Sequence, residues 1–129
     1  AARRGAIDRL FAGDDASAIL ARLEREEGPD ADWAKAIAAE ISAKSPTSVA
    51  IALRQVRIGG SLSFEEGMRT EFRIVSRILK GSDFYEGVRA VLVDRDNRPI
   101  WRPARLADLE DAAIAARFTT VPDGGDLVF

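Results

Sequence analysis

The residues of this chain that could take part in acid–base chemistry are carboxylates. Two carboxylates held close together can exchange a proton during a reaction, and the candidates are Glu65, Glu66, Glu86, Asp94 and Asp96. The three glutamates fall in the first turns of predicted helices, where negative charge is favourable beside the helix dipole. The two aspartates fall in a polar turn, where this residue type is common. We therefore interpret all five as structural and assign no catalytic residue to this chain.

Several other kinds of site are excluded by residue types that are missing. Histidine and cysteine do not occur among the 129 residues, which rules out an imidazole base, a thiolate nucleophile and a disulfide. The DRDN sequence at 94–97 lacks the glycine and the distal glutamate of a calcium loop, so we predict no metal site. Glycine-rich loops of the kinds that hold nucleotide phosphates are also missing.

A row of four cations is the strongest charge pattern. Its members, the basic stripe, are Arg69, Arg73, Arg77 and Lys80. Their spacing places them along one side of a helix. Either the stripe is a solvated face with ion pairs, such as Glu65 with Arg69, or it is a strip that contacts phosphate groups.

One glycine and one tryptophan stand out for packing. Gly87 lies inside a predicted helix, where glycine costs about 1 kcal/mol relative to alanine, so a neighbouring element is expected to pass close to it. Trp101 follows Pro99 and is expected to anchor its segment by burial, with stacking on a ligand as the alternative.

The elements that carry these residues are predicted to be helices at about 16–27, 33–44, 46–58, 64–80, 83–93 and 106–118. Ser45 followed by Pro46 is a strong helix start, and Ser63 with Glu66 forms a capping box. Gly81 is expected to close the fourth of these helices in a left-handed conformation. In the next helix four apolar residues are expected to face inward: Phe84, Val88, Val91 and Leu92.

We therefore predict one all-α unit of five to six helices over residues 1–118, followed by a loose tail at 119–129. With 47% hydrophobic and 31% charged residues the chain is typical of a soluble globular protein, and we expect a cytoplasmic location. The net charge of −2 argues against a broad nucleic-acid surface. No apolar run approaches the roughly 20 residues that cross a membrane.

Two segments resemble a known family. Lys44–Ser48 (KSPTS) and Gly81–Trp101 (GSDFYEGVRAVLVDRDNRPIW) are similar to the C-terminal region of the 3-hydroxyisobutyryl-CoA hydrolases, a branch of the enoyl-CoA hydratase/isomerase (crotonase) superfamily. The Glu86-Gly87 pair with Ala90 is shared with ordinary enoyl-CoA hydratases. The hydrolase branch is indicated by two groups of residues: Phe84-Tyr85, and Asp94-Arg95-Asp96 with Pro99 and Trp101.

The resemblance implies that the parent protein cleaves 3-hydroxyisobutyryl-CoA to the free acid and coenzyme A, a step of valine breakdown. Its carboxylates and oxyanion hole would lie in a β/α spiral core before residue 1, and no residue of this chain matches them. Coenzyme A is part of the substrate, so no separate cofactor is implied. The expected partners are that N-terminal core, the acyl-CoA and further copies of the protein, and the chain alone is expected to be inactive.

Arg95 is a candidate contact to the coenzyme A phosphates, because a basic residue near this position has that role in some hydratases. Two alternatives remain open. The chain could belong to an enoyl-CoA hydratase or isomerase, or it could be a free-standing helical interaction module.

Overall fold

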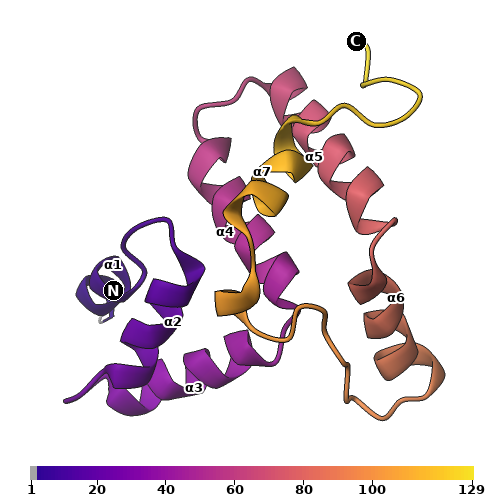
Figure 1. Cartoon of the computed structure of the whole chain (residues 1–129). Coiled ribbons are helices and arrows are strands. Elements are labelled where there is room, and N and C mark those ends of the chain that lie inside the picture. The colour runs from indigo at the N-terminus through magenta and orange to yellow at the C-terminus, as the bar shows by residue number, and fades with distance from the viewer. Residues whose placement is uncertain (1–2) are drawn as a thin grey trace.

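The structure, a computed structural model, describes residues 3–129; Ala1 and Ala2, which begin the expected helical region, lie outside the described residues. Over this range the chain is helical and contains no strand, which confirms the all-α class (Figure 1). The α-helices are α1 (Arg4–Leu10), α2 (Ala16–Arg25), α3 (Ala31–Ser42), α4 (Pro46–Gly59), α5 (Phe64–Ile78), α6 (Ser82–Val88) and α7 (Asp111–Thr119). A π-helical segment, η1 (Arg89–Val93), continues α6, and a 3-10 segment, η2 (Leu106–Asp108), precedes α7.

The helix starts follow the capping residues in the sequence. The Asp15 carboxylate accepts hydrogen bonds from two free amides at the start of α2. Ser45 accepts one from the Ser48 amide, with Pro46 as the first residue of α4. Ser63 and Glu66 form the predicted capping box of α5. These caps satisfy backbone donors that a helix start otherwise leaves without a partner.

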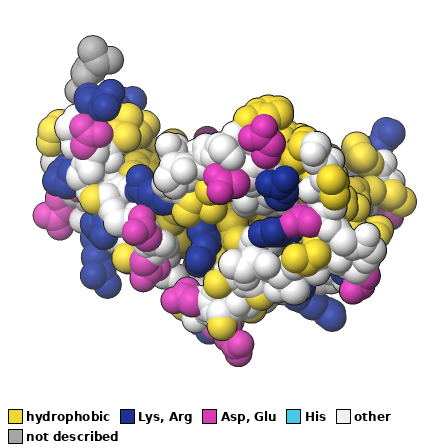
Figure 2. Space-filling view, turned by 90° about the horizontal axis from the view of Figure 1, so that it is seen from above, with side chains coloured by type: hydrophobic (Ala, Val, Ile, Leu, Met, Phe, Trp, Pro, Cys, Tyr) yellow, Lys and Arg dark blue, Asp and Glu magenta, His cyan; other side chains and the backbone are white. Residues whose placement is uncertain are grey.

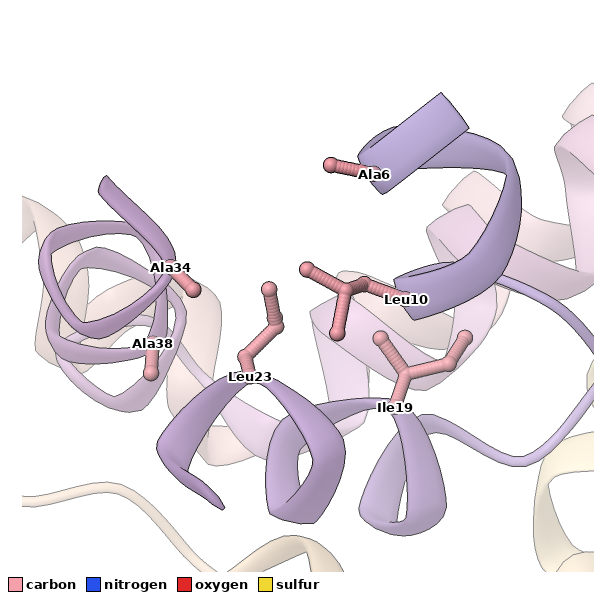
Figure 3. Packing of buried hydrophobic residues seen from close by; sticks show 6 residues of the cluster. All are labelled: Ala6, Leu10, Ile19, Leu23, Ala34 and Ala38. Carbon is pink, nitrogen blue, oxygen red and sulfur yellow. The ribbon is translucent and has the colours of Figure 1, made fainter. Parts of the chain in front are cut away.

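A first hydrophobic core joins α1, α2 and α3. Its buried members are Ala6, Leu10, Ile19, Leu23, Ala34 and Ala38 (Figure 3). Leu10 and Leu23 are almost fully buried, and the two alanines of α3 face Leu23 across a short gap. Small residues at these positions let α3 lie close to α2. Leu53 of α4 packs against the same cluster, which connects these three helices to the rest of the molecule.

A second core joins α4, α5 and α7. It is built from one or two buried residues of each helix: Ile51, Ile74, Ile114 and Phe118. The side of α5 that faces this core carries Thr70 and Ile74, and the Thr70 hydroxyl donates to the Glu66 carbonyl at 2.8 Å. The last expected helix, at 106–118, is interrupted because Leu109 and Glu110 adopt extended backbone conformations.

The third part is an arm formed by α6 and η1, which lies on the opposite side of the molecule from α1 (Figure 1). α6 contains no buried residue, and η1 contains only Ala90. The accessible surface is 8603 Å², whereas a compact protein of 14.0 kDa exposes about 6,700 Å². The described helices therefore leave about 1,900 Å² more surface in contact with solvent than a closed fold would.

Two expectations about α6 and the residue before it are wrong. Phe84, Val91 and Leu92 do not face inward, because their exposed fractions are 45%, 55% and 65%. Gly81 has φ of −91° and not a left-handed conformation, and it is the N-cap of α6. α5 then closes through ordinary right-handed turns at Leu79, whose amide donates back into the helix.

The tail after Thr119 forms no helix or strand, and its side chains and backbone contact residues of α5 and the turn after it. It contacts three members of the basic stripe: Lys80 pairs with Asp123 at 2.5 Å, Arg73 pairs with Asp126, and Arg69 donates to the Leu127 carbonyl at 3.1 Å. Two members of the stripe are therefore ion-paired, with partners that the tail supplies, and Arg77 forms no ion pair within the described residues. The alternative of a phosphate-contacting strip stays a prediction. The looseness expected of residues 119–129 concerns motion and stays a prediction.

None of the helices between residues 3 and 129 is both long enough and apolar enough to cross a membrane. The same residues include no group of three or more acidic side chains that could hold a metal ion.

Candidate functional site

The two segments that carry the family resemblance, 44–48 and 81–101, meet at the start of α4. The Ser45 hydroxyl, which caps α4, donates to the Asp83 carboxylate in the first turn of α6 at 2.5 Å. The other oxygen of Asp83 accepts from the Arg102 amide at 2.9 Å. Asp83 thus joins three chain segments. Because Ser45 is only 6% exposed, solvent reaches the bond between Ser45 and Asp83 poorly. Asp83 lies in the first turn of α6, where the predicted helix begins, and its carboxylate also connects α6 to α4.

Trp101 makes a second link at the same place. Its indole nitrogen donates to the Ala43 carbonyl at the end of α3, at 3.1 Å. Its ring lies over Gly87, where an added Cβ would be 3.4 Å from the nearest ring carbon. The expectation that an element passes close to Gly87 is confirmed, and that element is the tryptophan ring. Trp101 thereby has the expected anchoring role.

These links surround a groove of about 510 Å³ between the start of α4, the end of α5 and the arm. One wall is apolar and consists of Ile78, Phe84, Val88, Val91, Leu92 and Trp101. Most of these side chains are partly exposed, and hydrophobic side chains also interrupt the charged ones over the surface in Figure 2. The groove is wide enough for a flexible apolar group but is open to solvent along its length.

The charged lining of the groove is mostly basic. It includes four cations, Lys44, Arg77, Arg102 and Arg117, and one carboxylate, Asp83. Both oxygens of that carboxylate already accept hydrogen bonds. The Nε atoms of Arg77 and Arg117 are buried and have no partner within the described residues. A negatively charged group that is attached to an apolar one therefore suits this groove by its charge and its polarity.

The end of the arm is organised by Arg89. Its guanidinium forms a two-bond fork with Glu86, at 2.8 and 3.0 Å, and it also contacts Asp94 at 2.6 Å and Asp96 at 2.7 Å. The hydrogen bonds from Arg89, followed by the bond from the Ile100 amide, lower the pKa of Glu86 to about 2. Arg89 also lowers the pKa of Asp96.

Four of the five acidic residues considered for catalysis have structural partners. Glu66 belongs to the capping box, and Glu86, Asp94 and Asp96 surround Arg89. Within residues 3–129 the expected ion pair of Glu65 with Arg69 is not formed.

Arg95 lies at the tip of the turn after η1. It is exposed, it has a left-handed backbone with φ of 56°, and its Nε lies 3.5 Å from the Leu92 carbonyl. It does not line the groove. Its contact with coenzyme A phosphates stays a prediction.

A larger cleft, of about 610 Å³, separates α2 from α4 and the segment before α7. Four of its five charged residues are engaged in structural contacts: Arg57 pairs with Asp14 at 3.2 Å, Asp15 caps α2, and Arg54 stacks on the Phe118 ring. Neither of the two segments that carry the resemblance, 44–48 and 81–101, lines this cleft, so we do not place the site there.

Comparisons with known proteins match nearly the whole chain. The family model described as enoyl-CoA hydratase/isomerase matches residues 1–118. A relative from Arabidopsis thaliana, 3-hydroxyisobutyryl-CoA hydrolase 1, is 37% identical over 97% of this chain and 34% of its own length. The mitochondrial 3-hydroxyisobutyryl-CoA hydrolase of Gallus gallus is 38% identical over 81% of this chain and 26% of its own.

Solved structures show the same arrangement of helices. A carnitinyl-CoA dehydratase from Mycobacterium thermoresistibile superposes with a TM-score of 0.79 and 37% identity, over 93% of this chain and 34% of that protein. An enoyl-CoA hydratase from Rhodobacter sphaeroides 2.4.1 gives 0.81 and 32%, over 99% and 37%. The chain thus spans about a third of the length of the relatives that it matches. On the family model and these identities together, the chain belongs to the enoyl-CoA hydratase/isomerase family.

Proposed function

We propose that this chain is the helical C-terminal part of an acyl-CoA thioester hydrolase that acts on 3-hydroxyisobutyryl-CoA, and that it covers a catalytic core carried by the rest of that protein. The core would supply the reacting carboxylates and the oxyanion hole, a set of amides that stabilises the developing negative charge on the thioester oxygen. This chain would supply the cover of the acyl-CoA site. No catalytic residue is assigned to it.

The observation that supports a covering role is the exposed apolar surface of α5 and the arm. On α5 a single stripe of four residues is exposed: Phe64, Met68, Val75 and Leu79. On the arm Phe84, Val91 and Leu92 are exposed as well. A protein that works alone rarely leaves such large apolar groups together in water. The surplus of about 1,900 Å² is enough for a stable protein–protein interface, which buries roughly 800 Å² on each partner.

The hydrolase reaction is supported by the names of the relatives, since proteins 34–38% identical to this chain are named 3-hydroxyisobutyryl-CoA hydrolases. The competing candidate is hydration or dehydration of an acyl-CoA, because the two solved neighbours carry the names of a dehydratase and a hydratase. Both reactions bind an acyl-CoA, so the helical cover alone does not distinguish them.

The test is to assay the 129-residue chain and the full-length gene product with 3-hydroxyisobutyryl-CoA and with crotonyl-CoA. Released coenzyme A is measured with a thiol reagent, to which this cysteine-free chain gives no background. We expect release by the full-length protein and none by the chain. Release by the chain alone would overturn the covering role, and hydration of crotonyl-CoA without release would favour the competing reaction.

The covering surface has its own test in the full-length protein. Leu92→Asp, at a position that is 65% exposed in this chain, should weaken docking and lower activity, because it would place a charge in an apolar interface. Val56→Asp on α4 is the matched control, since Val56 is 76% exposed but lies outside α5 and the arm. Equal activity of the two variants would count against docking through the arm.

Four further points belong to this proposal. The reaction places the protein in valine breakdown. Coenzyme A enters as part of the substrate, with no separate cofactor, and the parent protein assembles as a homo-oligomer. The proposal keeps a cytoplasmic location, although the Gallus gallus relative is named mitochondrial, and cell fractionation would decide the compartment.

A further inference from the structure

Two arginines that line the groove lack a negatively charged partner. Arg77 comes from α5 and Arg117 from α7. Neither forms an ion pair within residues 3–129, and the Nε atom of each is buried without a hydrogen-bond partner. Arg117 donates to the Ala113 carbonyl of its own helix at 2.7 Å, which leaves its charge uncompensated. A charged group that is taken out of water without a partner is unfavourable, so an acceptor for these two side chains would stabilise the protein.

The carboxylates near these arginines are already engaged. Asp83 is the carboxylate that lines the groove, and both of its oxygens accept hydrogen bonds from other residues. Asp123 lies close enough for the charge of Arg77 to lower its pKa, but the hydrogen bond from Lys80 lowers this pKa more, and Asp123 pairs with Lys80. Within the described residues no groove carboxylate is therefore left for Arg77 or Arg117.

The acceptor that suits these arginines best is a permanent part of the protein. A substrate leaves after each reaction, and the buried donors would then lack a partner for part of every cycle. An acidic side chain on the same protein stays in place. The chain spans about a third of the length of its relatives, so most of the protein remains to supply such a side chain.

The surface beside the two arginines is apolar. Ile78, Phe84 and Leu92 line the same groove, and Phe84 and Leu92 are exposed in this chain. Apolar contacts around a pair of opposite charges exclude water from it, and arginine is often an anchor in interfaces of this kind. The groove therefore fits a segment that combines carboxylate and apolar side chains.

We infer that this groove is the docking site for an acidic segment of the catalytic core, whose carboxylate side chains pair with Arg77 and Arg117 while its apolar side chains pack on the arm. This inference rests on the proposed function and names the chemistry of the surface that the helices cover. The two arginines anchor the core and take no part in the reaction.

The first experiment compares thermal unfolding of the full-length gene product with that of the 129-residue chain. Arg77→Met keeps an unbranched stem and removes the charge. It should lower the midpoint of the full-length protein, because a carboxylate of the core would lose its partner in a buried pair. In the 129-residue chain the midpoint should stay unchanged or rise, because Arg77 has no partner there. Arg73→Met is the matched control on the same helix: its partner Asp126 lies within the chain, so the midpoint should fall in both proteins.

The second experiment identifies the partner in the full-length protein. Arg77→Lys and Arg117→Lys keep the positive charge and introduce a primary amine. A carbodiimide joins such an amine to a carboxylate in direct contact, and mass spectrometry of the digested protein locates the bond. Both variants should cross-link to one segment of the core. Arg105→Lys is the control, since its partner Asp108 lies within the chain, and it should cross-link there and not to the core.

Several results would overturn the inference. One is a cross-link from Arg77→Lys only to Asp123, or only to residues 3–129 of a second copy. Another is an Arg77→Met midpoint that is unchanged in the full-length protein or falls equally in both proteins. A third is weaker binding of coenzyme A to full-length Arg77→Met with unchanged binding of pantetheine, which lacks the coenzyme A phosphates, because the partner would then be a phosphate of the substrate.

These measurements do not depend on hydrolysis. A full-length protein that cross-links as expected but releases no coenzyme A from 3-hydroxyisobutyryl-CoA would refute the proposed reaction and leave the docking site intact. Release of coenzyme A without a cross-link to the core would do the reverse.

Discussion

The hydrogen bond between Ser45 and Asp83 should be a main link between α4 and the arm. It joins residues 38 positions apart in the sequence, and the hydroxyl that donates it is 6% exposed. We predict that replacing either residue by alanine destabilises the chain, and that the two losses are not additive because they share this bond.

The size of the effect follows from the bonds that each variant removes. Asp83→Ala loses the bond from Ser45 and the bond from the Arg102 amide, and a hydrogen bond to a charged group contributes about 1.5–3 kcal/mol. Water can replace the partner of the exposed Arg102 segment more easily, so we expect a total of about 2.5 kcal/mol. Ser45→Ala loses the shared bond and the cap of α4, which contributes about 1 kcal/mol, and should cost a similar amount.

The assay is urea unfolding of the single and double variants, followed by far-UV circular dichroism. We expect the double variant to lose about 3.5 kcal/mol, which leaves a coupling energy of about 1.5 kcal/mol between the two positions. Ser63→Ala is the control, because Ser63 caps α5 in the same way but does not contact Asp83. It should lose about 1 kcal/mol and show no coupling to Asp83.

A coupling energy near zero would refute this reasoning, since the losses would then come from independent causes. So would a loss for Ser45→Ala no larger than that for Ser63→Ala, because the buried bond to Asp83 would then add nothing to an ordinary cap.

Three further predictions concern other parts of the chain. The pKa of Glu86 is lowered to about 2 in the folded chain, so its contribution to stability is complete above its ordinary pKa and declines as the pH falls from about 4.5 toward 2; unfolding measured across pH should show this loss, and a chain equally stable at pH 3 and pH 7 would contradict it. Gly87→Leu should displace Trp101, because a side chain there meets the ring at Cβ, and the tryptophan emission should shift to longer wavelength, whereas Gly87→Ala should change it little. Arg73→Gln should release the tail from α5 by removing the pair with Asp126, so limited proteolysis after residue 118 should become faster; an unchanged rate would show that this pair does not hold the tail.

The helices and their starts could be predicted from the sequence because they depend on residues only a few positions apart. A hydroxyl or carboxylate at the N-cap reaches amides two or three residues later, as Ser45 and Ser63 do. The close approach at Gly87 was predictable for a related reason, since glycine inside a helix is unfavourable unless space is needed there. Helix α1 was not predicted, because no side chain caps its start and it spans only seven residues.

Local sequence signals do not show whether the apolar stripe of a helix faces the interior of the chain or its surface. A row of apolar residues shows that a helix has a partner, but it does not show whether that partner lies within the same chain. The stripe of α6 and η1 was therefore expected to face inward, whereas Phe84 and Leu92 are exposed. The groove likewise depends on segments far apart in sequence, and no local signal indicates that Asp83 would accept a bond from Ser45.

From the sequence alone came the helical class, the helix starts and the segments that resemble the acyl-CoA hydrolases, because each of these is recorded in residue types at short spacing. Only the tertiary structure decided that Ser45, Asp83 and Trp101 meet at one groove, that the tail pairs with Arg73 and Lys80 of the basic stripe, and that the arm leaves its apolar side uncovered. The physical reason is that burial and long-range hydrogen bonds depend on which surfaces lie opposite each other once the chain has folded.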